Sequence, residues 1–187
     1  MAIGSISNGE AGSSVRTKLN QTITKVNSSD GWITAVDDSL TSSVPLVIPD
    51  GTTVPLVNNN SGGVTTYAPS GGNGLYNGTR LVGDAIGDEY ELRITMNAFT
   101  TSNNGGFNLI IDISAAGDGS TPIVTYPVRM FRGTGPGNVQ QYTVNIPYFT
   151  LGTFIANGGQ VLIESVTGNT SVYGVSYYIK KVSSGEN

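Results

Sequence analysis

Apolar and polar residues alternate along much of the second half of the chain. In the clearest run, residues 89–98, every second residue is apolar: Tyr90, Leu92, Ile94, Met96 and Ala98. Because successive side chains of a strand point to opposite faces, this pattern predicts an antiparallel strand with one buried face. Residues 107–113 repeat the pattern, and glycine-rich turns separate further expected strands at 123–131, 140–146, 148–155, 160–166 and 172–181.

The start of the chain follows a helical period instead. Val15, Leu19, Ile23 and Val26 are spaced four, four and three residues apart, which places them in one narrow stripe along a helix. A helix of about four turns is marginal in water without tertiary packing. The stripe is therefore expected to pack on other polypeptides, which its narrowness favours, or on the chain's own β-domain, as amphipathic helices commonly do.

Polar residues around the helix N-terminus agree with this prediction. Ser13 or Ser14 is expected to be the N-cap, because a hydroxyl there accepts a backbone N–H that has no partner within the helix. Glu10 lies just before it, where the positive end of the helix dipole favours an acid. Arg16 and Lys18 are expected on the solvent side of the stripe.

Weaker signals follow the helix. Trp32–Val36 predicts a short strand. Two similar segments, 43–47 and 53–57, each contain a proline, which confines a strand to a sheet edge or an extended linker. We therefore expect three parts: an N-terminal anchoring and oligomerisation segment (1–31), an extended, edge-strand connecting region (32–74) and a β-sandwich (75–187).

About seven to nine short strands with glycine turns and almost no helix are typical of a sandwich or barrel. Eight strands in two sheets would form a jelly roll, which hides its strand edges. We therefore expect a mainly β protein, namely an antiparallel, jelly-roll-like β-sandwich preceded by a short N-terminal amphipathic helix.

The composition argues against several kinds of chemistry. The 187 residues include no cysteine and no histidine, which removes disulfides, thiol chemistry and the commonest general base and metal ligand. The net charge of −4 argues against nucleic-acid binding, which needs a basic face. No apolar run approaches the roughly 18–20 residues of a membrane span, and the N-terminus lacks the pattern of a signal peptide.

Acidic residues cluster at three places: Asp37–Asp38, Asp88 with Glu89 and Glu91, and Asp112 with Asp118. Glu89 and Glu91 share a strand face, and a glycosidase needs two carboxylates at one site, but this face also carries Arg93 and Thr95 and is expected to be solvated. The chain has no nucleophile elbow and no nucleotide-binding glycine motif. We therefore expect no enzyme, no catalytic residue and no cofactor. The acids are expected to be turn residues rather than metal ligands, with loop-bound Ca²⁺ left open.

Aromatic residues are frequent in the C-terminal half: Tyr142, Tyr148, Phe149, Tyr173, Tyr177 and Tyr178. Sugars stack on exposed aromatic faces flanked by amides and hydroxyls, and the chain is rich in such groups. The alternative is that these residues are strand formers in the core or at a subunit interface. Trp32 is expected to be a packing anchor between the helix and the sandwich.

One segment resembles a known protein family. Residues 8–20, NGEAGSSVRTKLN, are similar to a short module near the N-termini of tailed-bacteriophage virion proteins, with the pattern G-E-(S/T/A)-G-x-S-V-R-x-K-(L/I)-N. Glu10, Arg16, Lys18 and Leu19 match this module closely. The resemblance covers the first part of the chain alone and implies a virion structural protein, without indicating which one.

What the resemblance implies is a contact surface on the helix, made with a capsid or within an oligomer: Glu10, Val15, Arg16, Lys18, Leu19, Ile23 and Val26. We expect a homotrimeric capsid decoration (cement) protein that binds the major capsid protein on the outer surface of the virion, since no stalk or fibre repeat is expected. The alternative is a tail-fibre or head-fibre module that recognises a host surface glycan. Neither nucleic acid nor a membrane is an expected partner.

Overall fold

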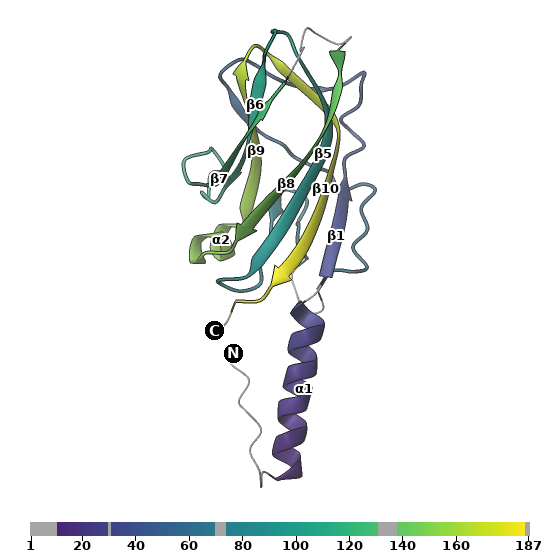
Figure 1. Ribbon diagram of the computed structural model, residues 1–187, viewed down its shortest axis with the longest axis vertical. Coiled ribbons are helices and arrows are strands. Elements are labelled where there is room, and N and C mark those ends of the chain that lie inside the picture. The colour runs from purple at the N-terminus through teal and green to yellow at the C-terminus, as the bar shows by residue number, and fades with distance from the viewer. Residues whose placement is uncertain (1–10, 30, 70–73, 131–137, 186–187) are drawn as a thin grey trace.

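The computed structural model describes residues 11–29, 31–69, 74–130 and 138–185, and for residues 24–29 the backbone alone. Within these residues, two antiparallel sheets pack face to face, and helix α1 (Gly12–Ser29) extends from one end of them (Figure 1). Sheet 1 has the strand order β1-β10-β5-β8, and β2 also pairs with β10. Sheet 2 has the order β3-β9-β6-β7, and β4 also pairs with β9.

The strands of sheet 1 are β1 (Gly31–Val36), β2 (Leu46–Ile48), β5 (Glu89–Thr100), β8 (Gln140–Phe149) and β10 (Thr170–Ser183). The strands of sheet 2 are β3 (Thr53–Pro55), β4 (Arg80–Leu81), β6 (Gly106–Asp112), β7 (Pro122–Arg129) and β9 (Gly159–Thr167). Most consecutive strands lie in different sheets, so the chain crosses repeatedly between the two layers. This arrangement confirms the expected mainly β, jelly-roll-like sandwich with a short helix before it.

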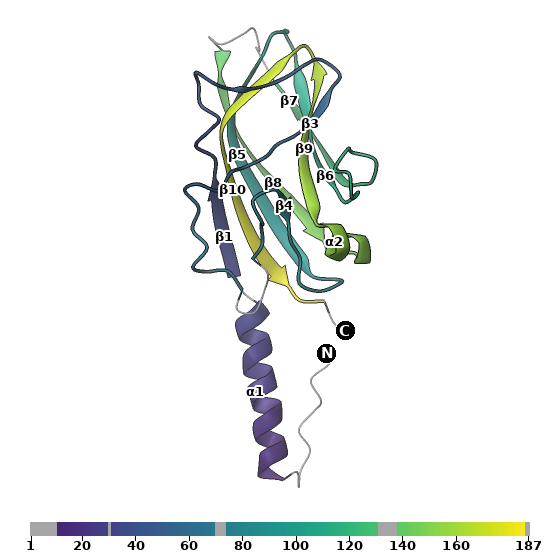
Figure 2. The same cartoon turned by 180° about the vertical axis from the view of Figure 1, so that it is seen from behind.

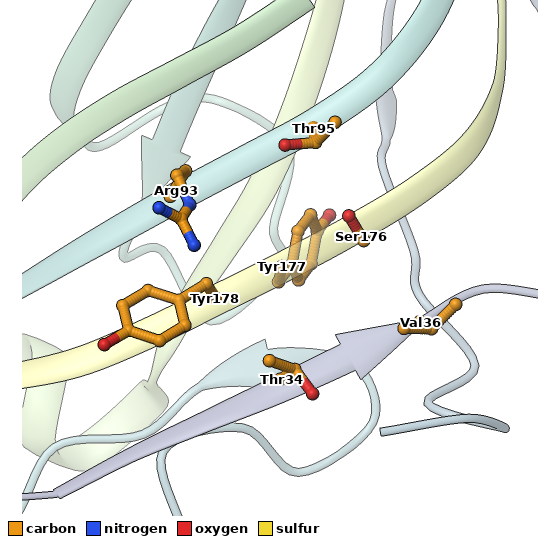
Figure 3. A pocket seen from close by; sticks show the side chains of 7 residues that line it. All are labelled: Thr34, Val36, Arg93, Thr95, Ser176, Tyr177 and Tyr178. Carbon is orange, nitrogen blue, oxygen red and sulfur yellow. The ribbon is translucent and has the colours of Figure 1, made fainter. Parts of the chain in front are cut away.

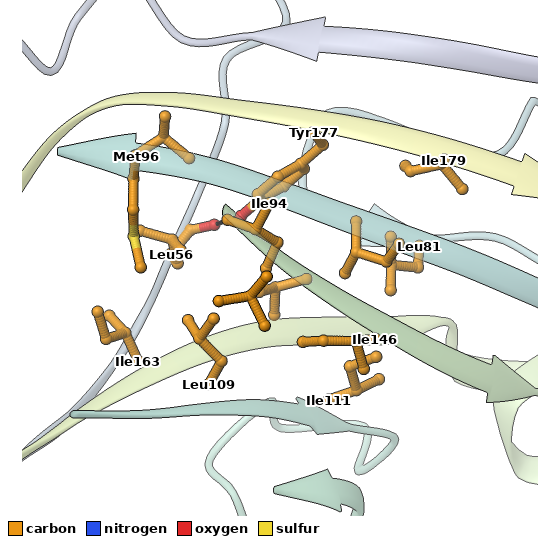
Figure 4. Packing of buried hydrophobic residues seen from close by; sticks show 14 of the residues in the cluster. Leu56, Leu81, Ile94, Met96, Leu109, Ile111, Ile146, Ile163, Tyr177 and Ile179 are labelled. Carbon is orange, nitrogen blue, oxygen red and sulfur yellow. Dashed lines mark hydrogen bonds between the residues drawn. The ribbon is translucent and has the colours of Figure 1, made fainter. Parts of the chain in front are cut away.

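Alternation along the strands produces the core. In β5 every second residue is buried, as the sequence predicts, and the facing strands of sheet 2 contribute Leu109, Ile111 and Ile163. Figure 4 shows these side chains meeting between the sheets. The hydroxyl of Tyr177 donates to the carbonyl of Leu56, so this buried polar group has a partner.

Part of the expected connecting region contributes strands to the sandwich: β1, β2 and β3 all lie between Gly31 and Pro55. The two proline-containing segments form β2 and β3, which are edge strands as expected but lie in different sheets. The turn at Pro49–Gly51 carries the chain between the layers, with Gly51 at a φ of 68° that favours glycine. Since β1 also lies in sheet 1, the sandwich begins at Gly31, well before residue 75.

One expected strand is wrong. Residues 148–155 do not form a strand of their own, because β8 runs without a break to Phe149 and the helix α2 (Gly152–Asn157) follows. The strand ends where the backbone N–H of Thr150 donates to the carbonyl of Asp88. The short helix then places Phe154, fully buried, against the ring of Tyr148 with the ring centres 5.4 Å apart.

Candidate functional site

Helix α1 begins earlier than expected. Its first residue is Gly12, and the carbonyl of Ala11 accepts the backbone N–H groups of Ser14 and Val15. Ser13 and Ser14 therefore lie inside the first turn, and the prediction that one of them is the N-cap is wrong. The hydroxyls of Thr17 and Thr22 bond back to carbonyls one turn earlier, which satisfies them on the helix itself.

In the described part of the apolar stripe of α1, Leu19 and Ile23 are uncovered. The helix projects beyond the end of the sandwich in both views and does not lie along either sheet (Figures 1 and 2). Leu19 is 49% exposed and Ile23 is 54% exposed, and Val15 is half-buried. The alternative that the stripe packs on the chain's own β-domain therefore does not hold for these three residues.

The other residues of the expected contact surface differ in exposure and in whether the structure describes them. Arg16 is exposed and Lys18 is half-buried, and both lie beside the stripe within its length. Glu10 lies outside the described residues, as does the side chain of Val26. The structure thus places Val15, Leu19 and Ile23 on one face of the helix, with Val15 half-buried and the other two exposed.

A second surface lies on sheet 1, on the face that points away from sheet 2. We call it the outer face of sheet 1. Its residues align across the strands in three rows: Trp32, Lys180, Glu91 and Pro147; Thr34, Tyr178, Arg93 and Asn145; and Val36, Ser176, Thr95 and Thr143. They are the positions that alternate with the core residues, so their placement follows from the strand period.

Aromatic rings stack on this outer face. Trp32 lies between Tyr67, with ring centres 4.9 Å apart, and Tyr178, with ring centres 5.6 Å apart. The guanidinium carbon of Arg93 lies 4.6 Å from the centre of the Tyr178 ring on sheet 1. Trp32 therefore anchors an aromatic stack on the sheet, and its expected packing against the helix would fall on side chains of residues 24–29, outside the described part of the chain.

Tyr67 reaches the stack from a loop. Its carbonyl accepts the backbone N–H of Trp32, and the carbonyl of Val64 accepts that of Thr34. This loop thereby occupies the hydrogen-bonding edge of β1, which would otherwise be free to pair with another chain. No strand or helix pattern marks Tyr67, and sequence reasoning missed it for that reason.

A hollow of about 200 Å³ opens on the outer face beside Tyr178. Its lining comes from three adjacent strands: Thr34, Val36, Arg93, Thr95, Ser176, Tyr177 and Tyr178. Figure 3 shows Arg93 and Tyr178 on one side of the hollow, with Thr34, Val36, Ser176 and Thr95 around the rest. Sequence reasoning identified Tyr178 but missed this grouping, because strand order decides which outward residues become neighbours.

The other aromatic residues of the C-terminal half divide between core and surface. Tyr148 and Tyr177 are buried, and Tyr142 packs edge-on against Phe107. Phe149 is exposed on β8, beyond the hollow. The core interpretation therefore holds for Tyr148 and Tyr177, whereas Tyr178 lies on the surface.

In two acidic clusters, backbone N–H groups donate hydrogen bonds to a carboxylate. Asp37 accepts backbone N–H groups from Ser39, Leu40 and Asn59. Burial raises the pKa of Asp37, but the N–H groups of Asn59 and Leu40 outweigh it and hold the pKa below its ordinary value. Asp112 accepts in the same way from Gly119 and Thr121 and also has a lowered pKa, because these bonds and that of Ser114 outweigh burial.

The third acidic cluster contains a buried ion pair. Nζ of Lys181 lies 2.8 Å from Asp88 and 3.1 Å from Asp84, and Lys181 and Asp88 are only 4% and 1% exposed. Burial raises the pKa of Asp88. The bond from Lys181 and those from the backbone N–H groups of Gly185 and Ala85 outweigh this effect and hold the pKa below its ordinary value. Burial lowers the pKa of Lys181, but Asp88 and Asp84 raise it above its ordinary value. These groups hold the fold together at this end of the sandwich.

The described residues contain no group of three or more acidic side chains close enough together to hold a metal ion. None of the described helices has the length and apolar character that a membrane crossing requires.

Comparisons with known proteins identify no family for the chain. No protein-family model matches the chain, and no curated protein matches it significantly. Similar solved structures include the PRD1 vertex protein P5, with 12% identity, a TM-score of 0.43 and coverage of 82% of this chain and 73% of that chain. Eiger TNF from S. frugiperda has 10% identity and a TM-score of 0.48, and the coverage is 84% of this chain and 96% of that chain.

A third similar structure is the C-terminal CBM6 of the laminarinase LamC from Zobellia galactanivorans. It has 10% identity and a TM-score of 0.37, and the coverage is 81% of this chain and 99% of that chain. At such identities and TM-scores, the three likenesses carry no conclusion about function.

Proposed function

We propose that the protein is a non-enzymatic structural component of a bacteriophage virion, a homotrimeric capsid decoration protein that binds the major capsid protein on the outer surface of the shell. The observation that carries the proposal is the uncovered stripe of α1. Leu19 and Ile23 keep about half of their surface exposed on a helix that projects from the sandwich. The resemblance of residues 8–20 to the virion module adds the class of partner.

The stripe fits a contact between polypeptides. Full burial of one Leu or Ile side chain contributes roughly 1.5–3 kcal/mol, so covering both residues provides a modest contact per subunit. A trimer presents three such contacts at once, and linked weak contacts bind far more tightly than one alone. Because the protein would bind the assembled shell and not its separated subunits, binding would stabilise the assembled form.

Charge extends the same surface. Arg16 and Lys18 lie next to the stripe, and α1 contains no Asp or Glu between residues 12 and 29. We expect the exposed Arg16 to meet an acidic group of the major capsid protein, whereas Glu10 of the same expected surface lies outside the described residues.

The test uses the full chain with a Leu19→Asp substitution. A charge in the stripe is expected to dissociate the trimer or abolish binding to expanded empty shells, while the sandwich stays folded by circular dichroism. Gln21→Asp is the matched control, because Gln21 is exposed on the opposite side of the helix. Wild-type protein should bind shells in stoichiometric trimers and raise their disruption temperature.

Removal of residues 1–27 provides a second test. The core residues among the described positions all lie beyond α1, so the shortened chain is expected to fold. It should fail to bind shells. If it decorates shells normally, or if Leu19→Asp and Gln21→Asp bind equally well, the proposal is wrong.

A second candidate function is a fibre module that binds a host surface glycan. The observation that favours it is the aromatic stack beside a hollow on the outer face of sheet 1. Such a module should adsorb to host cells, and free polysaccharide should block the adsorption. Protein that binds shells but never cells would exclude this candidate.

A further inference from the structure

Arg93 lies at the hollow on the outer face of sheet 1 with its guanidinium held in place. It lies over the ring of Tyr178, and that ring also stacks with Trp32. Among the described residues, no carboxylate lies within ion-pair distance of Arg93, although Glu91 is on the same strand face. A guanidinium presents several N–H groups in a planar fork that matches a carboxylate. The arrangement therefore leaves a preorganised anion-binding group facing the hollow.

Hydroxyl groups surround the rest of the hollow. Thr34, Thr95 and Ser176 come from three adjacent strands, and the strand register aligns Ser176 with Thr95. The hydroxyl of Thr34 accepts the backbone N–H of Val64 at 3.0 Å, which fixes it while its own hydrogen can still donate. The hydroxyls of Thr95 and Thr143 bond to each other at 3.3 Å, and either can be the donor. Groups that both donate and accept match the hydroxyls of a sugar.

Size and charge narrow the class of ligand. The hollow of about 200 Å³ is smaller than the roughly 300–1,000 Å³ of sites for drug-sized molecules, so it suits one ring and not an oligomer. A dianionic phosphate is usually held by several cations or free backbone N–H groups. Here Arg93 is the one cation in the lining, and β5 and β10 are paired on both sides. A singly charged carboxylate fits better.

We propose that this hollow binds a single sugar ring that carries a carboxylate, such as a uronic acid or a sialic acid of a surface polysaccharide. Arg93 binds the carboxylate, and the hydroxyls of Thr34, Thr95 and Ser176 bind those of the ring. Val36 and the edge of Tyr178 provide the apolar wall for its C–H groups. The inference deepens the second candidate function and rests on it for the biological setting, while the binding step itself concerns free sugars.

The test measures binding of free sugars to the full-length protein by saturation-transfer NMR and titration. The probes are the methyl glycosides of glucuronic, galacturonic, mannuronic and N-acetylneuraminic acid, with methyl glucoside, galactoside and mannoside as neutral counterparts. At least one acid is expected to bind, and its neutral counterpart should bind about tenfold more weakly or worse, since a hydrogen-bonded charge pair contributes about 1.5–3 kcal/mol.

Two arginine variants locate the site. Arg93→Gln should weaken binding of the acid about tenfold or more, whereas Arg129→Gln, on β7 of the other sheet, should leave it unchanged. Thr95→Val should weaken binding of the acid by a smaller factor than Arg93→Gln does. The inference is overturned if no acid binds, if acid and neutral sugars bind equally, or if the two arginine variants behave alike.

Hydrogen exchange on the wild-type oligomer tests one further outcome. If β1, β5 and β10 are protected on this face by subunit contact, and Arg93→Gln dissociates the oligomer, the outer face is a contact between copies and the inference fails. If the protein binds a sugar acid but does not adsorb to cells, the sugar site stands and the second candidate function is wrong.

Discussion

Along β5 of the sandwich the alternate residues from Tyr90 to Ala98 are almost completely buried, whereas along α1 Leu19 and Ile23 keep about half of their surface in contact with solvent. The two regions have equally regular apolar patterns, so the pattern alone does not decide where a side chain is buried. The sandwich provides a facing sheet for each strand. The helix has no facing element within the described chain, so its stripe is available to another polypeptide.

The largest expected effect concerns the ion pair that closes one end of the sandwich. Lys181→Ala should lower the free energy of unfolding by about 3–5 kcal/mol, because it leaves Asp88 buried without its cation. Lys180→Ala, at the neighbouring exposed position, should change it by less than about 0.5 kcal/mol. Denaturant unfolding measures both. Equal effects would show that this end of the sandwich does not depend on the pair.

The same substitution in each region tests the comparison directly. Leu109→Ala should cost about 2–5 kcal/mol of sandwich stability, because it opens a cavity between the sheets. Leu19→Ala should change sandwich stability by less than about 0.5 kcal/mol, since the residue is half exposed. Leu19→Ala should instead weaken the oligomer in sedimentation velocity. A sandwich that loses stability with Leu19→Ala would mean that the helix stripe packs on it after all.

Acid should lower the stability of the sandwich, because its buried carboxylates accept hydrogen bonds in their ionised form. Asp37, Asp88 and Asp112 have pKa values below 3.8 in the folded chain, so their contribution to stability is fully present above that pH. It is lost as the pH falls through their lowered pKa values. Since the chain has no histidine, stability should be nearly constant from about pH 5 to 8. Thermal unfolding across this range measures the profile, and a transition near pH 6.5 would contradict it.

The smallest expected effect on stability concerns a buried hydroxyl in the core. The hydroxyl of Tyr148 is buried, and the described residues offer it no hydrogen-bond partner. Tyr148→Phe should therefore leave stability unchanged or raise it by up to about 1 kcal/mol. Tyr177→Phe is the control, because it deprives the carbonyl of Leu56 of its donor and should cost about 1–3 kcal/mol. A loss of stability in Tyr148→Phe would indicate a partner for this hydroxyl.

Local rules predicted well where one periodicity dominated. The alternation in β5 and β6 gave both the strands and their buried faces, and the four-residue spacing gave α1. The rules failed where tertiary contacts compete with propensity. Residues 150–155 have strand-like composition, yet Thr150 bonds across to Asp88 and Phe154 turns inward on α2. Burial of the Phe154 ring stabilises this turn of helix.

The candidate sites divide in the same way. Val15, Leu19 and Ile23 were identifiable from sequence, because a helix places them on one face by its own geometry. Arg93, Thr95 and Ser176 were not, because they lie on strands separated by up to 83 positions in the chain and meet only through the order β1-β10-β5.

By itself, the sequence determined the mainly β class, the N-terminal helix with its apolar stripe, and which residues of β5 and β6 face inward. These properties depend on residues close together in the chain, whose geometry is set by the backbone period. The tertiary structure alone decided that Trp32 joins Tyr178 on an outer sheet face and that the helix stripe stays uncovered. Such neighbours are fixed by which strands pair over long separations, and the local pattern of apolar residues carries no information about that choice.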